Sequence, residues 1–175
     1  ATADRTTLAR PRAAVVGGAG HGSSTLLDLM FALRPIDQGE LVMDGVDLRH
    51  WPLEALREDV ALVRGTEIVS GTILENVALG RANIGPSEVR DALEVVGLLP
   101  SVLNWPAGID TPLMAGGRPL TSTQRVRLVL ARAIVGKPRL LLLDESLEGL
   151  DGSSVDELAP FLFAAGNPWT LVVVT

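Results

Sequence analysis

The chain has 175 residues, 47% of them hydrophobic, which is enough for one well-cored domain with a subdomain. Its 15 basic and 21 acidic residues give a net charge of −6 without any basic run, which argues against a nucleic-acid partner, because that needs clustered positive charge. Cysteine is absent, so the chain has no disulfide framework and no thiolate metal site. No apolar run approaches the roughly 18–20 residues that span a bilayer, and the polar start at residues 1–5 is unlike a signal peptide.

A glycine-rich loop, Gly17–Thr25, lies near the start of the chain, between a strand predicted at residues 12–16 and a helix predicted from residue 26. Strand, glycine loop and helix form the context of a phosphate-binding P-loop, in which backbone N–H groups and the helix N-terminus face phosphate oxygens. The lysine position of GxxxxGK[ST] holds Ser23, so a charge-assisted contact of about 1.5–3 kcal/mol is missing. The alternative is a glycine-rich turn without a ligand.

Strands and helices alternate downstream of this loop, but the apolar spacing becomes helical from about residue 65 to residue 136. The sequence therefore predicts an α/β core, residues 1–64 and 137–175, interrupted by an all-helical insert, residues 65–136. Helices are predicted at residues 52–59, 72–79, 87–98, 121–135 and 153–165, and strands at residues 39–45, 60–63, 139–144 and 170–175.

The most informative of these strands is Leu140–Leu143, which runs directly into Asp144 and Glu145. Four apolar residues in a row are typical of a buried parallel strand, and ligands of such sheets lie beyond the carboxyl ends of the strands. An Asp at that edge suits Mg²⁺, and the adjacent Glu suits the polarisation of a water molecule. The alternative is an ordinary core strand that ends in a solvated turn.

In chain order, these motifs resemble the nucleotide-binding domain of ABC transporters, most closely of the exporter type. The glycine-rich loop stands at the Walker A position and Leu140–Asp144 at Walker B, whereas residues 120–125 stand where the family has LSGGQ, and residues 149–151 resemble its D-loop. Residues 70–77 closely match a phrase that exporters carry after their Q-loop, although alone they also fit a capped helix. The resemblance implies a P-loop NTPase core with a mostly parallel sheet and a helical signature subdomain.

The resemblance also implies a ligand, ATP with Mg²⁺, and roles for individual residues. Glu145 would polarise the attacking water, and Ser24 and Asp144 would hold Mg²⁺. The other residues expected at the nucleotide come from the loop, the Q-loop position, the signature and the D-loop: Gly17, Gly20, His21, Gly22, Ser23, Ser24, Thr25, Arg64, Thr121, Gln124 and Asp151. His21 also fits a solvated loop position.

Three motifs depart from the family's pattern. Ser23 replaces the Walker A lysine, and Ser122 and Thr123 replace signature glycines, which let a helix N-terminus approach the γ-phosphate of the opposing subunit. Arg64 stands at the Q-loop glutamine; its guanidinium is hypothesised to replace the lysine in part, the alternatives being solvation or a pair with Glu67. With both acids of the Walker B strand retained, these departures predict a domain that binds nucleotide but turns it over poorly.

The signature position has a second interpretation. Thr121 and Gln124 form the pattern T-x-x-Q, in which a helix N-terminus is capped by reciprocal hydrogen bonds without any ligand. Both interpretations remain open at the level of the sequence.

In the family, two such domains dimerise head to tail, and each ATP lies between one P-loop and the partner's signature. The implied partners are thus a second nucleotide-binding domain, in a homo- or heterodimer, and a transmembrane domain. The chain, itself expected to be soluble, would lie at the cytoplasmic face of the cell membrane. Since it begins after the family's N-terminal strands and ends before its C-terminal part, we expect a fragment.

The leading prediction is the ATP-binding domain of an ABC exporter with impaired turnover. The alternative is a non-catalytic partner that dimerises with an active ABC ATPase subunit and regulates it. A soluble P-loop kinase or a DNA-linked ATPase is disfavoured by residues 70–77 and by the acidic balance.

Overall fold

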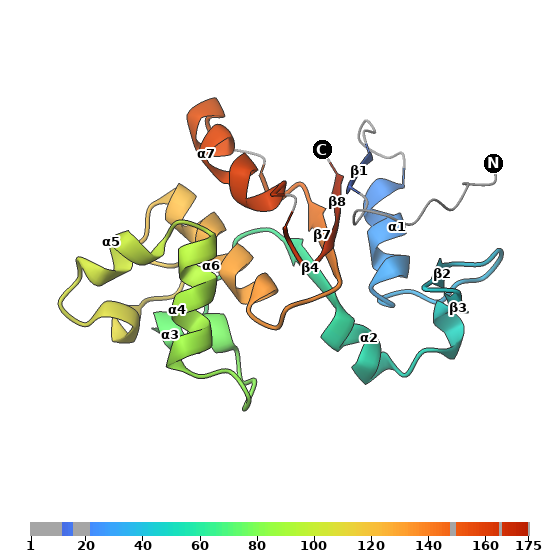
Figure 1. The fold of residues 1–175 in the computed structure, drawn as a ribbon, viewed down its shortest axis with the longest axis horizontal. Coiled ribbons are helices and arrows are strands. Elements are labelled where there is room, and N and C mark those ends of the chain that lie inside the picture. The colour runs from blue at the N-terminus through green and yellow to red at the C-terminus, as the bar shows by residue number, and fades with distance from the viewer. Residues whose placement is uncertain (1–11, 16–21, 148–149, 165, 175) are drawn as a thin grey trace.

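A four-stranded parallel sheet lies at the centre of the computed structural model (Figure 1), which describes residues 12–15, 22–147, 150–164 and 166–174. Its strands, in spatial order, are β1 (Arg12–Val15), β8 (Thr170–Val174), β7 (Leu140–Asp144) and β4 (Val60–Arg64). Neighbouring strands all run parallel, so the predicted α/β fold with a parallel sheet is confirmed. The register pairs Asp144 with Arg64 on one side and with Val174 on the other, so three segments distant in sequence meet at the carboxyl edge.

Strand β7 is buried on both faces, as its apolar run predicts. Leu141 and Leu143 belong to an apolar cluster shared with the helices of the insert. Leu140 and Leu142 belong to a second cluster that includes Leu27. Because successive strand residues point to opposite faces, a strand covered on both sides has no polar positions left to alternate.

The second cluster is formed with the helices α1 (Ser23–Met30) and α2 (Leu53–Asp59). They contribute Leu27 and Leu56, which are buried against Leu142 and Val172 of the sheet. Between the two helices lie the short strands β2 (Val42–Met43) and β3 (Val46–Asp47) and the 3₁₀ turn η1 (Leu48–His50). The Asp-Gly turn predicted after residue 43 connects the two strands.

The insert contributes α3 (Ile73–Ala78), α4 (Pro86–Val95), α5 (Leu99–Leu103), the 3₁₀ turn η2 (Gly108–Asp110) and α6 (Ser122–Ile134). It is not purely helical, because β5 (Gly71–Thr72) pairs antiparallel with β6 (Pro112–Leu113). Strands of two residues are too short to give a periodic signal, which is why the sequence did not predict this ladder.

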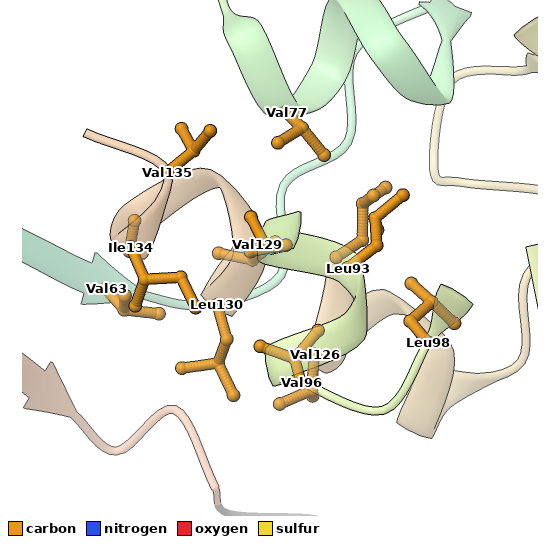
Figure 2. Packing of buried hydrophobic residues seen from close by; sticks show 14 of the residues in the cluster. Val63, Val77, Leu93, Val96, Leu98, Val126, Val129, Leu130, Ile134 and Val135 are labelled. Atoms are coloured by element: carbon orange, nitrogen blue, oxygen red, sulfur yellow. The ribbon is translucent and has the colours of Figure 1, made fainter. Parts of the chain in front are cut away.

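Helix α6 joins the insert to the sheet. Figure 2 shows Val129 and Leu130 of this helix among Val63 of β4, Val77 of α3 and Leu93 of α4. Leu130, Val77 and Leu93 are fully buried. The sheet edge and the insert therefore share one apolar cluster.

The chain continues from β7 into α7 (Gly152–Leu162) and returns to the sheet as β8. None of the helices within the described ranges combines the length and the apolar character that crossing a bilayer requires.

Candidate functional site

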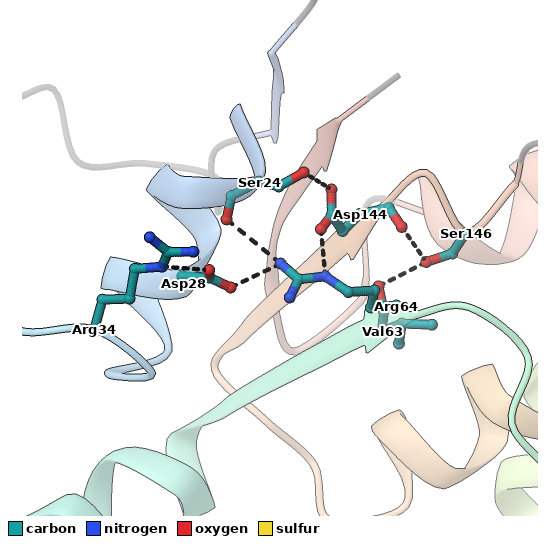
Figure 3. A network of polar contacts seen from close by, with 7 residues as sticks. All are labelled: Ser24, Asp28, Arg34, Val63, Arg64, Asp144 and Ser146. Carbon is teal, nitrogen blue, oxygen red and sulfur yellow. Dashed lines mark hydrogen bonds and ion pairs between the residues drawn. The ribbon is translucent and has the colours of Figure 1, made fainter. Parts of the chain in front are cut away.

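The carboxyl edge of the sheet holds a cluster of polar side chains around Asp144 (Figure 3). Arg64 ends β4 directly beside Asp144, and its Nε donates a hydrogen bond of 2.5 Å to Asp144 Oδ2. The Ser24 hydroxyl, from the first turn of α1, donates a hydrogen bond of 3.0 Å to Asp144 Oδ1. Each carboxylate oxygen of Asp144 thus has one donor.

Helix α1 contributes a second carboxylate, Asp28, which lies one helical turn after Ser24 and therefore on the same face. Arg64 Nη2 donates to Asp28 Oδ1 over 2.8 Å and to the Ser24 carbonyl oxygen over 3.4 Å. Arg34 Nε donates to the other Asp28 oxygen over 2.9 Å. The Asp28–Arg64–Asp144 bridge ties α1 to strands β4 and β7.

The bridge joins two buried carboxylates through one partly exposed guanidinium. The side chains of Asp144 and Asp28 are only 3% and 11% exposed, whereas that of Arg64 is 43% exposed. The hydrogen bond from Arg64 lowers the pKa of Asp28 below its ordinary value, so this carboxyl is ionised at neutral pH. Burial disfavours the charge of Arg64, but its hydrogen bonds to Asp28 and Asp144 outweigh this and raise the pKa of Arg64.

The N-terminus of α1 lies next to this bridge and has no side-chain cap. Gly22 is the N-cap residue with a left-handed φ of 82°, a conformation that favours glycine, and no acidic residue lies in the first turn. The first backbone N–H groups of a helix have no intrahelical partner and carry partial positive charge, so such an end suits a phosphate. Of the loop residues predicted to bind nucleotide, Gly17, Gly20 and His21 lie outside the described residues.

Ser23 and Thr25 lie in this first turn with Ser24, Ser23 partly buried and Thr25 exposed. The structure therefore places the described part of the predicted loop beside Asp144. This proximity is the geometry that a phosphate site needs, with helix N–H groups and an acid-bearing strand end side by side.

Glu145 follows Asp144 and is exposed at the same edge. Its φ of 50° is left-handed, which is uncommon for a residue with a side chain, and its N–H donates to the Val174 carbonyl oxygen. Ser146, which sequence analysis did not single out, is buried, and its hydroxyl donates to the Val63 carbonyl oxygen over 2.6 Å. A small polar residue directly after two acids was the available signal. Together these contacts fix the turn that presents Glu145.

The predicted signature residues cap the N-terminus of α6. The Thr121 hydroxyl accepts from the Gln124 N–H over 3.2 Å, and the Gln124 side chain accepts from the Thr121 N–H over 3.0 Å. The structure thus contains the capping box that the sequence offered as the alternative interpretation. Thr123, at a signature glycine position, hydrogen-bonds through its hydroxyl to Ser154 of α7 over 3.1 Å.

Asp151, in the predicted D-loop, is the N-cap residue of α7. Its Oδ1 accepts from the Ser154 N–H over 2.8 Å and from the Ser153 hydroxyl over 2.6 Å, and these bonds lower the pKa of Asp151. Within the described parts of the chain, neither Asp151 nor the capping pair of α6 hydrogen-bonds to the cluster around Asp144.

The sequence offered two alternative interpretations of Arg64, a solvated side chain or an ion pair with Glu67. The structure shows neither, because Arg64 pairs with Asp144 and Asp28. The Glu67 carbonyl oxygen instead accepts from Arg132. Both alternatives were wrong because they treated Arg64 as a loop residue, whereas it is the last residue of β4 and the strand register places it against Asp144.

The arrangement does not fit Mg²⁺ as it stands. Both Asp144 oxygens already accept hydrogen bonds, the Ser24 hydroxyl is a donor to one of them, and the Arg64 cation holds the other. No group of three or more His, Cys, Asp or Glu side chains suited to a metal occurs in the part of the chain that the structure describes.

Comparison with known proteins identifies the family. A family model described as "ABC transporter" matches residues 6–148. The chain is 37% identical to P-glycoprotein 14 of Caenorhabditis elegans over 150 residues, covering 85% of this chain and 11% of that protein. It is also 37% identical to the uncharacterized ABC transporter ATP-binding protein YfiB of Bacillus subtilis over 146 residues, covering 82% of this chain and 26% of that protein.

A solved structure titled as a bacterial Atm1-family ABC exporter with ATP bound superposes with a TM-score of 0.86 at 27% identity, covering 95% of this chain and 29% of that one. The chain thus spans about a quarter or less of the curated relatives named above. The family generally comprises ATPases that bind nucleotide and Mg²⁺ and act with a transmembrane domain. The chain belongs to the ABC transporter family, with exporters among its relatives.

Proposed function

We propose that this chain is the ATP-binding domain of an ABC exporter and couples ATP binding and hydrolysis to transport across a membrane. Family membership and the exporter relatives support the proposal. The observation that carries it is the uncapped N-terminus of α1 beside the Asp144 carboxylate at the sheet edge. Backbone N–H groups there would bind phosphate oxygens without any lysine.

The roles of single residues belong to the same proposal. Residues 17–25 would surround the phosphates, and Glu145 would polarise the attacking water. The left-handed φ of Glu145 supports this role, because strained backbone is concentrated at functional sites. Its carboxylate is exposed, as a residue that acts on water requires.

The proposed assembly is a head-to-tail dimer of nucleotide-binding domains, attached to a transmembrane domain at the cytoplasmic face of the membrane. Residues 65–136 would form the signature subdomain, and residues 1–64 and 137–175 the ATP-binding core. Thr121, Gln124 and Asp151 would face the nucleotide held by the partner's P-loop. All three lie at helix N-termini, with Thr121 and Asp151 exposed and Gln124 half-buried, which supports this arrangement.

Impaired turnover is the finer part of the proposal. The lysine position holds Ser23, and the Thr123 hydroxyl at a signature glycine is engaged with Ser154 of the same chain. A non-catalytic regulatory role is the second candidate, and one observation favours it. The Thr121–Gln124 capping box already satisfies donors that a γ-phosphate would otherwise meet.

Titration of the intact protein with ATP, ADP and adenosine tests the proposal. If phosphates are held at α1, affinity should decrease in that order, since each lost phosphate removes charge-assisted hydrogen bonds. Equal affinities, or no binding of ATP, would contradict it. Steady-state ATP hydrolysis, measured with and without a partner subunit, separates the catalytic from the regulatory candidate.

A further inference from the structure

The Arg64 guanidinium lies at the position where a nucleotide site of this kind is expected to hold a cation. It contacts both Asp144, at the end of β7, and Asp28, on α1, and it also reaches the Ser24 carbonyl oxygen in the first turn of α1. Asp144 and Ser24 are the two residues that the family resemblance assigns to Mg²⁺. A positive charge of the chain's own therefore stands between the P-loop helix and the acid-bearing strand.

We propose that Arg64 is the resident cation of this site and takes the place of the divalent cation, so that the protein binds nucleotide phosphates without Mg²⁺. The inference rests on the proposed function, because it specifies the form of nucleotide that the same site accepts. It accounts for two departures from the family together: the lost lysine at Ser23 and the gained arginine at the end of β4.

The charges of the cluster are already balanced. Asp28 and Asp144 carry two negative charges, and Arg34 and Arg64 carry two positive charges within ion-pair distance of them. Mg²⁺ at Asp144 would be close to the Arg64 guanidinium, and these like charges would repel each other beside a carboxylate that is only 3% exposed. Mg²⁺ also demands nearly octahedral oxygen ligands at about 2.0–2.1 Å, whereas the Asp144 oxygens hold N–H and O–H donors.

Arg64 retains capacity for a ligand while it holds the two acids. A guanidinium has five N–H donors in a planar fork. Nε and Nη2 are engaged, but Nη1 has no hydrogen-bond partner among the described residues, and the side chain is 43% exposed. A guanidinium can therefore bind carboxylates on one side and a phosphate oxygen on the other.

A purely structural ion pair is the competing explanation, and the matched residue Arg34 provides the control. Arg34 also binds Asp28 through its Nε, at 2.9 Å, but among the described residues it pairs with that carboxylate alone, and its side chain is 60% exposed. Arg34→Gln thus removes a guanidinium from the cluster without freeing Asp144.

The experiment compares ATP affinity in excess MgCl₂ with affinity in EDTA, for the intact protein and the variants Arg64→Gln and Arg34→Gln. The parent and Arg34→Gln should bind ATP equally well in both buffers, within about twofold. In EDTA, Arg64→Gln should bind ATP about tenfold or more weakly than the parent, as expected for the loss of one charge-assisted contact. Arg64→Lys, which keeps the charge, should have the parent's ATP affinity in both buffers. It is the second variant to measure if Arg64→Gln does not fold. Parent binding that weakens about tenfold in EDTA would overturn the inference.

A second arm contains no nucleotide and separates failure of the inference from failure of the proposed function. Thermal melting is followed with MgCl₂, MnCl₂ or EDTA. The parent's melting temperature should not respond to either metal, and that of Arg64→Gln should rise, because its two acids are then without their shared cation. Stabilisation of the parent by metal, or no response of Arg64→Gln, would overturn the inference. Absence of ATP binding in every buffer, with the melting pattern intact, would contradict the proposed function and the nucleotide part of the inference, whereas the replacement of the divalent cation by Arg64 would stand.

Discussion

The carboxyl edge of the sheet and the N-terminus of α6 are both polar, but their hydrogen bonds have different origins. At the sheet edge, Arg64 and Asp144 are separated by 80 residues and Ser24 and Asp144 by 120. At α6, the reciprocal bonds of Thr121 and Gln124 close within three residues. The first region depends on the packing of α1, β4 and β7, whereas the second needs only one helix end.

The comparison shows where function and stability are coupled in this chain. The buried acids of the long-range cluster connect α1, β4 and β7, so changes there should affect both folding and ligand binding. The local cap is exposed and self-contained, so changes there should affect stability mildly and nucleotide binding by this chain hardly at all. Five predictions test that division, from the largest expected effect to the smallest.

Glu145→Gln should reduce the ATP hydrolysis that this P-loop contributes to the assembled protein. The expected reduction is about 10²–10⁴-fold, the usual contribution of a general base. The amide keeps the shape of the side chain but not its charge, and the side chain is exposed, so the substitution should cost little stability. Steady-state hydrolysis and ATP titration measure the two effects, and binding should be retained. An unchanged rate would mean that this site is inert and would support the regulatory role.

Asp144→Asn should lower the free energy of unfolding by about 1–3 kcal/mol, since the amide nitrogen would face the Arg64 guanidinium and leave a buried group unsatisfied. The upper part of that range is discounted because Arg64 is 43% exposed and partly screened by water. Urea denaturation measures the change. Asp59→Asn, which loses only an exposed contact of 3.4 Å to Arg139, is the matched control and should be nearly neutral.

Arg64→Gln and Ser23→Lys should be coupled in ATP binding. If Arg64 supplies the charge that the missing lysine would provide, its loss should weaken binding about tenfold more in the parent than in the Ser23→Lys variant. A double-mutant cycle of ATP affinities measures this coupling. Additive effects would show that the two positions act independently and that the hypothesis of compensation is wrong.

Thr121→Ala should lower the free energy of unfolding by about 1 kcal/mol, because it removes the acceptor of the Gln124 N–H at the start of α6. ATP binding by this chain alone should not change, since the cap lies apart from the Asp144 cluster. Ser122→Ala is the control and should shift stability by less than about 0.5 kcal/mol, because Ser122 is exposed and, among the described residues, its hydroxyl accepts only from Arg125. A larger effect on ATP binding than on stability would contradict the division between the two regions.

Acid should weaken the α1 end of the cluster. The pKa of Asp28 is lowered in the folded state by Arg64, so the folded protein holds its proton less tightly than the unfolded chain. The stabilisation is therefore complete above the unfolded pKa and is lost as the pH falls below about 4. Denaturation midpoints against pH measure the effect, and Arg64→Gln should show a smaller loss in that window. An identical acid profile for both proteins would contradict this cause.

The sequence by itself determined the features that rest on local chemistry. The apolar run of β7 predicted a strand buried on both faces, and T-x-x-Q indicated the capping box of α6 as one of two interpretations. The helical spacing of residues 72–79 predicted a helix, which is α3, and the capped-helix alternative for residues 70–77 is present as the Thr72–Glu75 capping box. Each signal lies within one element, where the 3.6-residue period of a helix or the pattern of a strand relates neighbours directly.

Only the tertiary structure decided the partners of Arg64. The sequence places Arg64 near the Q-loop position but does not give the β4–β7 register that sets it beside Asp144. Nor does it show that Asp28, one turn after Ser24, faces the same guanidinium, or that the Ser146 hydroxyl reaches the Val63 carbonyl oxygen. Contacts between distant segments depend on the register and docking of whole elements, which local periodicity does not encode. The side chain whose sequence-based alternatives were wrong is therefore the one that two distant segments, α1 and β7, hold in place.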